Sequence, residues 1–467
     1  MPRAIAAIRR RLEEPWDVAG LVAFRVIFGL LLLAAVARTV LSGWVETFYL
    51  EPTFAFHYPG FDWVATPPGP VLYALFAVLA VSALAIAVGA LYRVATVVFL
   101  AVFAYVELLD VTFYLNHYVL VSLLAALLAV LPLHRAGSVD AWLRPSIRVR
   151  TLPAWMTWAL RFQVGVVYVF AALAKLQPDW LLHGQPLGIW LASRSDLAVV
   201  GPWMDDAWLA LTMSWAGFLY DLTIPLWLLW RRSRPFALAV VLAFHAATGV
   251  LFNIGMFPWL MSGFALVFFD PSWPRSLARR FGWRQARDKS LGAPAEAVRL
   301  RRPAVLALAL WAGLQVAIPL RAHAYGGDVL WHEQGMRFSW RVMVRQKSGS
   351  VVYRVRTADH PAERYLRPDQ YLTLHQEREM SGQPDLIVQL AHRIAGDLEA
   401  RGERGVEVRV DAWASLNGRP RARLIDPDVD LTEVHPSVLP ATWIAAAPEG
   451  PPLPAGGRPA YARTGRR

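Results

Sequence analysis

Ionisable and amide side chains inside apolar stretches are the residues of this sequence that could carry chemistry. Lys175 closes one apolar stretch, His245 lies within another, and Asn116 and His117 open a third. A polar group at membrane depth is costly unless it is paired or faces a cavity, so each of these residues is a candidate functional residue. We predict that Lys175, His117 and His245 meet around one cavity, within about 15 Å, the rise of roughly ten helical residues.

Lys175 is the most informative candidate because almost every basic residue in the sequence is arginine. Its lysines are confined to positions 175, 289 and 347. Arginine keeps its proton in a protein, whereas a lysine desolvated among apolar groups can lose its proton and act as a base. The alternative is a structural role, in which the Lys175 ammonium extends from a helix end to the membrane interface.

The histidines and the asparagine suggest hydrogen-bond donation. Neutral imidazole and carboxamide groups stabilise a developing oxyanion without adding a full charge, as a quinol-type substrate would require. For His117 and His245 the alternative is a hydrogen-bonded packing role. Three further charged residues lie within apolar stretches: Arg25, Arg161 and Asp221. Arg25 and Arg161 lie toward the cytoplasmic ends and are interpreted as interface or ion-pair residues.

Several classes of site are excluded or unsupported. The chain has no cysteine, so disulfides and cysteine-ligated metals are excluded. We find no HExxH, Walker A, GxGxxG or GxSxG motif, and the histidines lack metal-ligand spacing, so no metal site is predicted. The net charge of +12 would suit nucleic acid, but the basic residues cluster in short loops between apolar stretches, so no nucleic-acid partner is predicted.

Long apolar stretches must position the candidate residues. The sequence is 56% hydrophobic with a mean hydropathy of +0.36, which indicates a membrane protein. We predict an α-helical polytopic protein with about nine transmembrane helices, whose remaining partner is the lipid bilayer. The stretches span residues 18–41, 69–92, 94–110, 116–133, 155–177, 207–230, 235–253, 256–270 and 303–320.

The loops between these stretches alternate in charge. The N-terminus, Arg93 and the loops 134–154, 231–234 and 271–302 are basic, whereas carboxylates gather in the intervening loops. Basic loops remain in the cytoplasm, so the ninth helix would deliver the C-terminal part to the opposite face. We therefore predict a multi-pass membrane protein whose C-terminal part faces away from the cytoplasm. In a bacterial inner membrane that location is the periplasm or outside.

The sequence pattern changes from about residue 321. Residues 337–356 alternate in the manner of a β-hairpin that turns at Ser348 and Gly349, residues 385–398 form an amphipathic helix, and residues 406–414 alternate again. We predict three parts: a transmembrane domain over residues 1–320, an extracytoplasmic α+β domain over residues 321–447, and a disordered tail rich in proline, glycine and arginine over residues 448–467.

Short peptides in the same order along nearly all of residues 18–435 resemble the vitamin K-dependent gamma-carboxylase family, which belongs to the horizontally transferred transmembrane (HTTM) domain superfamily. The matching peptides are residues 24–29, 115–118, 174–180, 244–245, 251–257, 270–275, 338–344 and 426–430. By this resemblance Lys175 corresponds to the catalytic base. Asn116, His117 and His245 correspond to active-site residues near the quinol, and His323 corresponds to a further histidine there.

The resemblance also implies where a substrate binds. Trp340 and Arg345 lie in the segment that corresponds to the glutamate-binding region, although Arg345 stands where the family has a histidine. Animal members of the family carry a lysine doublet where this chain has Ala174 and Lys175, and they have a longer C-terminal part. Recognition of an animal-type propeptide is therefore not expected.

The implied activity is that of a carbon–carbon lyase, a peptidyl-glutamate 4-carboxylase. Its cofactor is reduced vitamin K, as phylloquinone or menaquinone hydroquinone, with O2 and CO2 as co-substrates and a glutamate-containing protein or peptide as substrate. By this resemblance Lys175 as the free amine would deprotonate the quinol. Oxygenation of the quinol to the epoxide would then drive removal of a glutamyl γ-proton in a dry pocket, and the resulting carbanion would capture CO2. The alternatives are a quinol-oxygenating enzyme with another acceptor and a transporter with a buried proton relay.

Overall fold

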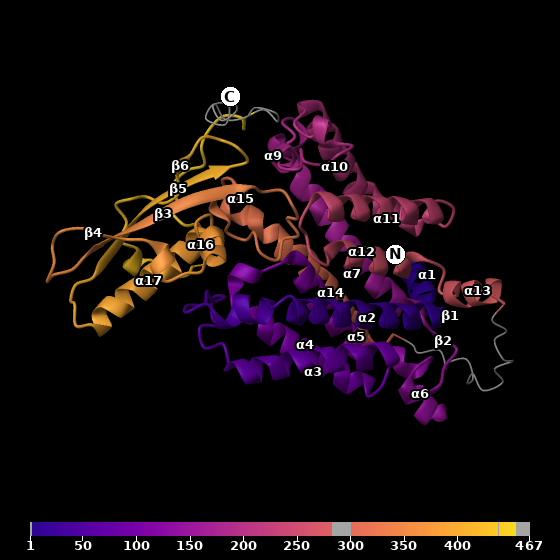
Figure 1. Ribbon diagram of the computed structural model, residues 1–467. Helices are drawn as coiled ribbons and strands as arrows, with labels where there is room; N and C mark the ends of the chain where they lie inside the picture. The colour runs from indigo at the N-terminus through magenta and orange to yellow at the C-terminus, as the bar shows by residue number, and fades with distance from the viewer. Residues whose placement is uncertain (1, 283–299, 438, 454–467) are drawn as a thin grey trace.

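The computed structural model describes residues 2–282, 300–437 and 439–453. A bundle of long helices forms the first two thirds of the chain, and a small sheet with helices against it lies at one end of the bundle (Figure 1). The helices are α1 (Pro2–Glu13), α2 (Ala19–Leu41), α3 (Gly69–Val88), α4 (Tyr92–Leu108), α5 (Asn116–Val130), α6 (Val139–Leu143), α7 (Ala154–Lys175), α8 (Pro178–Leu181), α9 (Leu187–Ala192), α10 (Ala207–Leu229), α11 (Arg234–Leu251), α12 (Phe257–Phe264), α13 (Trp273–Arg280), α14 (Arg302–Leu320), α15 (Val329–His332), α16 (Leu374–Met380) and α17 (Pro384–Ala400). The strands are β1 (Pro15–Asp17), β2 (Thr151–Pro153), β3 (Lys347–Arg356), β4 (Arg364–Leu366), β5 (Glu407–Leu416) and β6 (Ala422–Arg423).

Each predicted apolar stretch contains a helix, but the count of nine spans is not confirmed. Among the described residues, 6 helices are long and apolar enough to cross a membrane: α2, α3, α7, α10, α11 and α14 with the turn after it. The α4 and α5 helices have 17 and 15 residues, and α12 has 8 before a 3-10 turn. At 1.5 Å per residue, 15 to 17 residues cover roughly 23 to 26 Å, which is short of a hydrocarbon core of about 30 Å.

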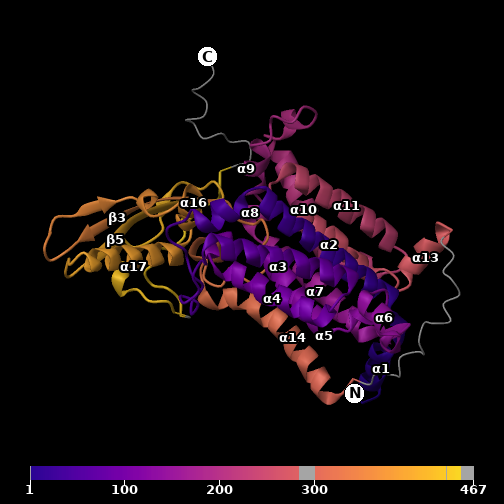
Figure 2. The same ribbon diagram turned by 60° about the horizontal axis from the view of Figure 1, so that its bottom comes forward.

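The α7 helix is the most buried of these membrane-crossing candidates, whereas α14 is the least buried. Figure 2 shows α14 running along the outside of the bundle, where lipid would surround it. The α2 and α3 helices approach so closely that a Cβ atom at Gly29 would lie 2.6 Å from the carbonyl oxygen of Ala83. Small residues permit such contacts between membrane helices. The high burial of α7 places this helix, which ends at Lys175, in the interior of the bundle.

The N-terminus and the C-terminal part lie at opposite ends of the bundle (Figure 1). At the N-terminal end, β1 pairs antiparallel with β2, and Asp17 forms a 2.9 Å ion pair with Arg275. These contacts join the N-terminus, the 134–154 loop and the segment after α12, which are three of the basic segments. The predicted alternation of loop charge agrees with this arrangement.

The C-terminal part contains a four-stranded antiparallel sheet in the order β4-β3-β5-β6. The β3 and β5 strands pair from Lys347 opposite Leu416 to Arg356 opposite Glu407. The predicted helix over residues 385–398 is confirmed as α17, whose apolar face is buried and whose Ile387 carbonyl accepts a hydrogen bond from the Tyr353 hydroxyl at 2.9 Å. The predicted strand over residues 406–414 is confirmed as β5.

The predicted hairpin over residues 337–356 is wrong. Residues 347–356 form the single strand β3, which passes straight through Ser348 and Gly349, and its partner β5 comes from far along the chain. Gly349 permits a close approach rather than a turn, because a Cβ atom there would lie 2.0 Å from the Ser381 carbonyl oxygen. Phe338, Trp340 and Met343 have positive φ angles of 62°, 57° and 54°, so the segment before β3 is irregular loop.

The C-terminal part is fastened to the bundle by buried polar contacts. The Asp179 carboxylate at the start of α8 accepts hydrogen bonds from both terminal nitrogens of Arg419, at 2.6 and 2.7 Å, and from Asn417 at 2.9 Å. The Gln376 amide donates to Asp110 at 2.8 Å. The predicted tail over residues 448–467 falls largely outside the described residues, although the Leu453 carbonyl accepts a hydrogen bond from Gln185.

Arg419→Gln is expected to lower the free energy of unfolding by about 2 kcal/mol, because it leaves the buried Asp179 carboxylate without its charged partner. Thermal unfolding of the detergent-solubilised protein measures the change. Arg421→Gln is the matched control, since Arg421 is exposed. Equal unfolding temperatures for the two variants would show that the Asp179 contact does not hold the two parts together.

Candidate active site

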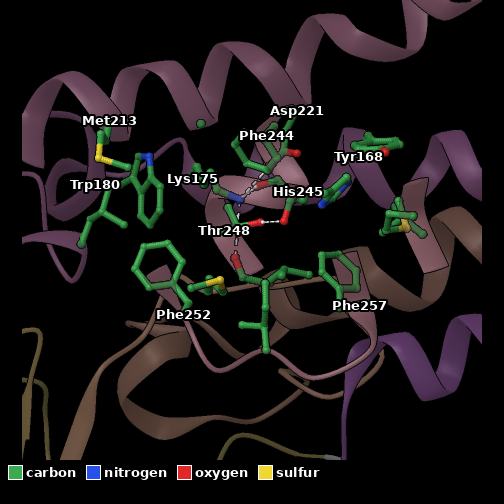
Figure 3. A pocket seen from close by; sticks show the side chains of 18 residues that line it. Tyr168, Lys175, Trp180, Met213, Asp221, Phe244, His245, Thr248, Phe252 and Phe257 are labelled. Carbon is green, nitrogen blue, oxygen red and sulfur yellow. Dashed lines mark hydrogen bonds and ion pairs between the residues drawn. The ribbon is translucent and has the colours of Figure 1, made fainter. Parts of the chain in front are cut away.

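The Lys175 side chain lies in the protein interior. Its Nζ donates to the Asp221 carboxylate at 2.8 Å and to the carbonyl oxygens of Ala171 and Val342 at 3.4 and 3.5 Å, and it lies 5.2 Å from the centre of the Trp180 ring. Figure 3 shows Lys175 and Asp221 pointing toward each other at the wall of a cavity. The Lys175 amine is therefore directed into this cavity and away from the lipid interface.

Asp221 is the site residue whose importance the sequence analysis missed. It lies in the middle of α10, and the side chains of Lys175 and Asp221 are only 7% and 9% exposed. The sequence contained one indication, because a carboxylate in an apolar helix requires a partner and Lys175 is a rare lysine. The amine and the carboxylate can each carry a proton, so the pair can exchange a proton with a ligand in the neighbouring cavity.

The cavity beside Lys175 is small and mostly apolar, with a volume of about 80 Å³. His245 lies on its wall, with Nε2 at 3.4 Å from the Tyr220 hydroxyl oxygen, while its buried Nδ1 finds no hydrogen-bond partner among the described residues. The phenylalanines 244, 252 and 257 form much of the remaining wall (Figure 3). A space of this size holds a few water-sized molecules and is far smaller than a drug-sized ligand pocket.

Asn116 and His117 line a second and larger cavity of about 520 Å³. Its walls come from α2, α3, α4, α5 and the segment before α12, and they are largely aromatic and aliphatic. Arg38 and Glu107 are among its few charged residues. Ligand pockets typically measure about 300 to 1,000 Å³ and combine apolar walls with a few polar groups, so this cavity can accept a bicyclic ligand.

The two cavities adjoin each other. The side chains that line both come from the segment before α12, from the first residue of α12 and from the loop before β3: Ile254, Phe257, Val342 and Met343. The Phe257 ring centre lies 5.9 Å from that of His117 and 5.8 Å from that of His245, so the two imidazoles lie within the predicted separation of about 15 Å. The prediction of one shared cavity is correct only in part, because Lys175 and His245 line one cavity and His117 lines its neighbour.

The structure does not bring every candidate residue to these cavities. His323 is exposed and lines neither of them. Trp340 is 2% exposed and packs into the apolar core of the helix bundle. Arg345 is bound to Glu333 and lines a third, polar cavity together with Asn116. The roles that the resemblance implies for these residues stay predictions.

The described part of the chain holds no group of three or more histidine, aspartate or glutamate side chains that could ligate a metal ion. The polar groups of the site are instead single donors and acceptors placed around apolar cavities. Such an arrangement suits proton transfer and the binding of a largely apolar ligand.

Comparison with known families agrees with the structural division of the chain. The HTTM domain matches residues 13–273, which is more than half of the sequence and contains Lys175, Asp221 and His245. The lumenal domain of the vitamin K-dependent gamma-carboxylase matches residues 300–450, which include β3, β5 and α17. No solved structure matches the chain. Both domains of one family thus occur here in consecutive order, and the chain belongs to the vitamin K-dependent gamma-carboxylase family.

Proposed function

We propose that this protein is a membrane-embedded carboxylase, a carbon–carbon lyase that couples oxygenation of a reduced naphthoquinone to carboxylation of glutamyl side chains. The observation that carries the proposal is the buried Lys175–Asp221 pair, which lines a small cavity that adjoins a second cavity large enough for the quinone. Its membrane helices and the two matching family domains support it.

The cavity of about 520 Å³ fits the ring system of phylloquinone or menaquinone hydroquinone. Its aromatic walls would contact the ring faces, and Asn116 and His117 would donate hydrogen bonds to the ring oxygens. When bound, the reduced quinone supplies two electrons and, with O2, the basicity needed to remove a γ-proton. The reactants are reduced quinone, O2, CO2 and a glutamyl residue, and the products are quinone epoxide, water, γ-carboxyglutamate and a proton.

Lys175 acts as the base that accepts a proton from a ligand hydroxyl. As the free amine its Nζ has a lone pair, and Asp221 at 2.8 Å holds the resulting ammonium in place. The Val342 carbonyl at 3.5 Å and the Trp180 ring confine the amine on its other sides. The surrounding phenylalanines exclude water, which would otherwise quench a strong base.

The proposal is tested by incubating the purified protein with reduced menaquinone or phylloquinone, O2, labelled bicarbonate and a glutamate-containing peptide. We expect both quinone epoxide and labelled γ-carboxyglutamate. Epoxide without label would indicate the alternative of a quinol oxygenase with another acceptor. Absence of both products would contradict the proposal, and a membrane-potential-driven flux in vesicles would then favour the transporter.

We also propose that the C-terminal part faces the periplasm of a bacterial cell, because it lies at the end of the bundle opposite the basic segments. A reporter that functions only in the cytoplasm is expected to be silent when fused after Ala447. The same reporter fused before Pro2 serves as the control and is expected to be active. An active C-terminal fusion would overturn the proposed orientation.

A further inference from the structure

A third cavity, of about 180 Å³ and polar in character, lies where the C-terminal part meets the helix bundle. Its walls carry the guanidinium groups of Arg337, Arg341 and Arg345 and the carboxylates of Glu333 and Glu379. Three arginines around so small a space would repel one another unless anions neutralise them. The partners of each arginine therefore decide what the cavity can bind.

Two of the three arginines are already neutralised by the protein. Arg337 donates to the Asp385 carboxylate at 2.6 Å and to the Gln383 side chain at 2.5 Å. Arg345 is bound to Glu333, which also accepts from Lys347 at 3.2 Å. These guanidinium groups are held in place and have carboxylate partners of their own.

Arg341 differs from its neighbours. The described residues give its guanidinium no hydrogen bond and no ion pair, and its Nε is fully buried without a partner. Burial lowers the pKa of Arg341, and only the more distant charge of Asp328 opposes this effect. Buried donors in native proteins are nearly always satisfied, so a guanidinium that lines a cavity and whose buried Nε has no partner points to an anionic ligand.

We propose that Arg341 binds the γ-carboxylate of a glutamyl side chain in the polar cavity. The anionic ligand is inferred from the unpartnered guanidinium, whereas its identity as a glutamyl residue rests on the proposed function. Arginine suits this role because its planar donors bind both oxygens of a carboxylate. The assignment differs from the one implied by the resemblance, since Arg345 already has Glu333 as its partner.

The position of the cavity suits the reaction. It shares Tyr114, Asn116 and Met343 with the quinone-sized cavity, so a glutamyl side chain would lie directly beside the quinone. Val342, the residue after Arg341, accepts the hydrogen bond from Lys175. Removal of a γ-proton places negative charge next to the carboxylate, and a guanidinium bound to that carboxylate stabilises the additional charge.

The test uses the full-length protein in detergent without quinone, and two short N-acetylated peptides that contain either a glutamate or a glutamine. Wild type is expected to bind the glutamate peptide more tightly. Arg341→Gln is expected to weaken its binding by about tenfold or more and to leave glutamine-peptide binding unchanged. Arg341→Lys, which keeps the charge without the bidentate geometry, is expected to have an intermediate effect.

Arg378→Gln is the control, because Arg378 is exposed and lines a neighbouring surface pocket. It is expected to bind the glutamate peptide as wild type does, and unfolding temperatures establish that each variant is folded. Equal glutamate-peptide affinity of wild type and Arg341→Gln would overturn the inference, as would a wild type that does not distinguish the peptides. Failure of the proposed function would instead appear as absence of epoxide from wild type.

Discussion

Lys175→Arg is expected to abolish quinone epoxidation while the protein remains folded. Arginine keeps a positive charge next to Asp221 and retains hydrogen-bond donors, but its guanidinium does not release its proton at any accessible pH. Loss of a general base typically costs about 10² to 10⁴ in rate, so turnover should fall by about this factor. Chromatographic measurement of epoxide reports the activity, and the unfolding temperature shows whether the variant is folded, so a loss of catalysis is distinguished from a loss of structure.

The matched control for this variant is Lys347→Arg. Lys347 is as deeply buried as Lys175 and also binds a carboxylate, that of Glu333, but it lies outside both apolar cavities. Its variant should retain epoxidation. Near-normal epoxidation by Lys175→Arg would show that position 175 has a structural role and that the chain shares the family's fold without this part of its chemistry.

The second large effect concerns the stability of the Lys175–Asp221 pair. Asp221→Leu leaves an ammonium in an apolar cavity without its anion, and removal of one member of a buried ion pair costs about 3 to 5 kcal/mol. The double variant Lys175→Met with Asp221→Leu removes both polar groups and should recover most of this loss. Denaturant unfolding of the single and double variants in detergent measures the coupling free energy.

The Lys175→Met single variant and the double variant both lack the amine and should not catalyse epoxidation, so stability and activity are separated within one set of proteins. Losses of stability that simply add in the double variant would contradict the pairing of the two residues. The result also has a mechanistic meaning, because a strongly coupled pair holds the amine at the cavity wall.

The helices could be predicted closely from the sequence because hydrophobic stretches mark them directly. The stretch 207–230 corresponds to α10 over Ala207–Leu229, and 303–320 corresponds to α14 over Arg302–Leu320. The number of spans could not be predicted in the same way. Apolar character does not reveal where a helix ends, and α5 and α12 end before they reach the length of a bilayer.

The hairpin prediction failed for a reason that lies in tertiary structure. Alternation over residues 337–356 is compatible with two strands and a glycine turn, or with irregular loop followed by one strand. The contact between Gly349 and the Ser381 backbone, which requires the glycine, comes from a distant part of the chain. The pairing of β3 with β5 is likewise a long-range contact that local pattern does not contain.

The candidate site could be predicted in its residues more readily than in its geometry. Lys175 was evident because lysine is rare in this sequence, and His245 and His117 because they interrupt apolar stretches. The pairing of Lys175 with Asp221 depends on how α10 is rotated against α7, which the sequence does not specify. The two cavities meet at Phe257 of α12 and at Met343 of the C-terminal part, which line both of them, and the sequence does not reveal this contact.

The most direct test of the central claim, that Lys175 acts as a base through its free amine, is chemical rescue of Lys175→Ala. The alanine variant opens space beside the cavity, and a small primary amine such as methylamine is expected to restore part of the epoxidation. The rescued rate should increase with amine concentration and should rise with pH toward the amine's own pKa, because only the neutral amine accepts a proton. Epoxidation by Lys175→Ala without any added amine, at a rate close to that of wild type, would contradict the claim.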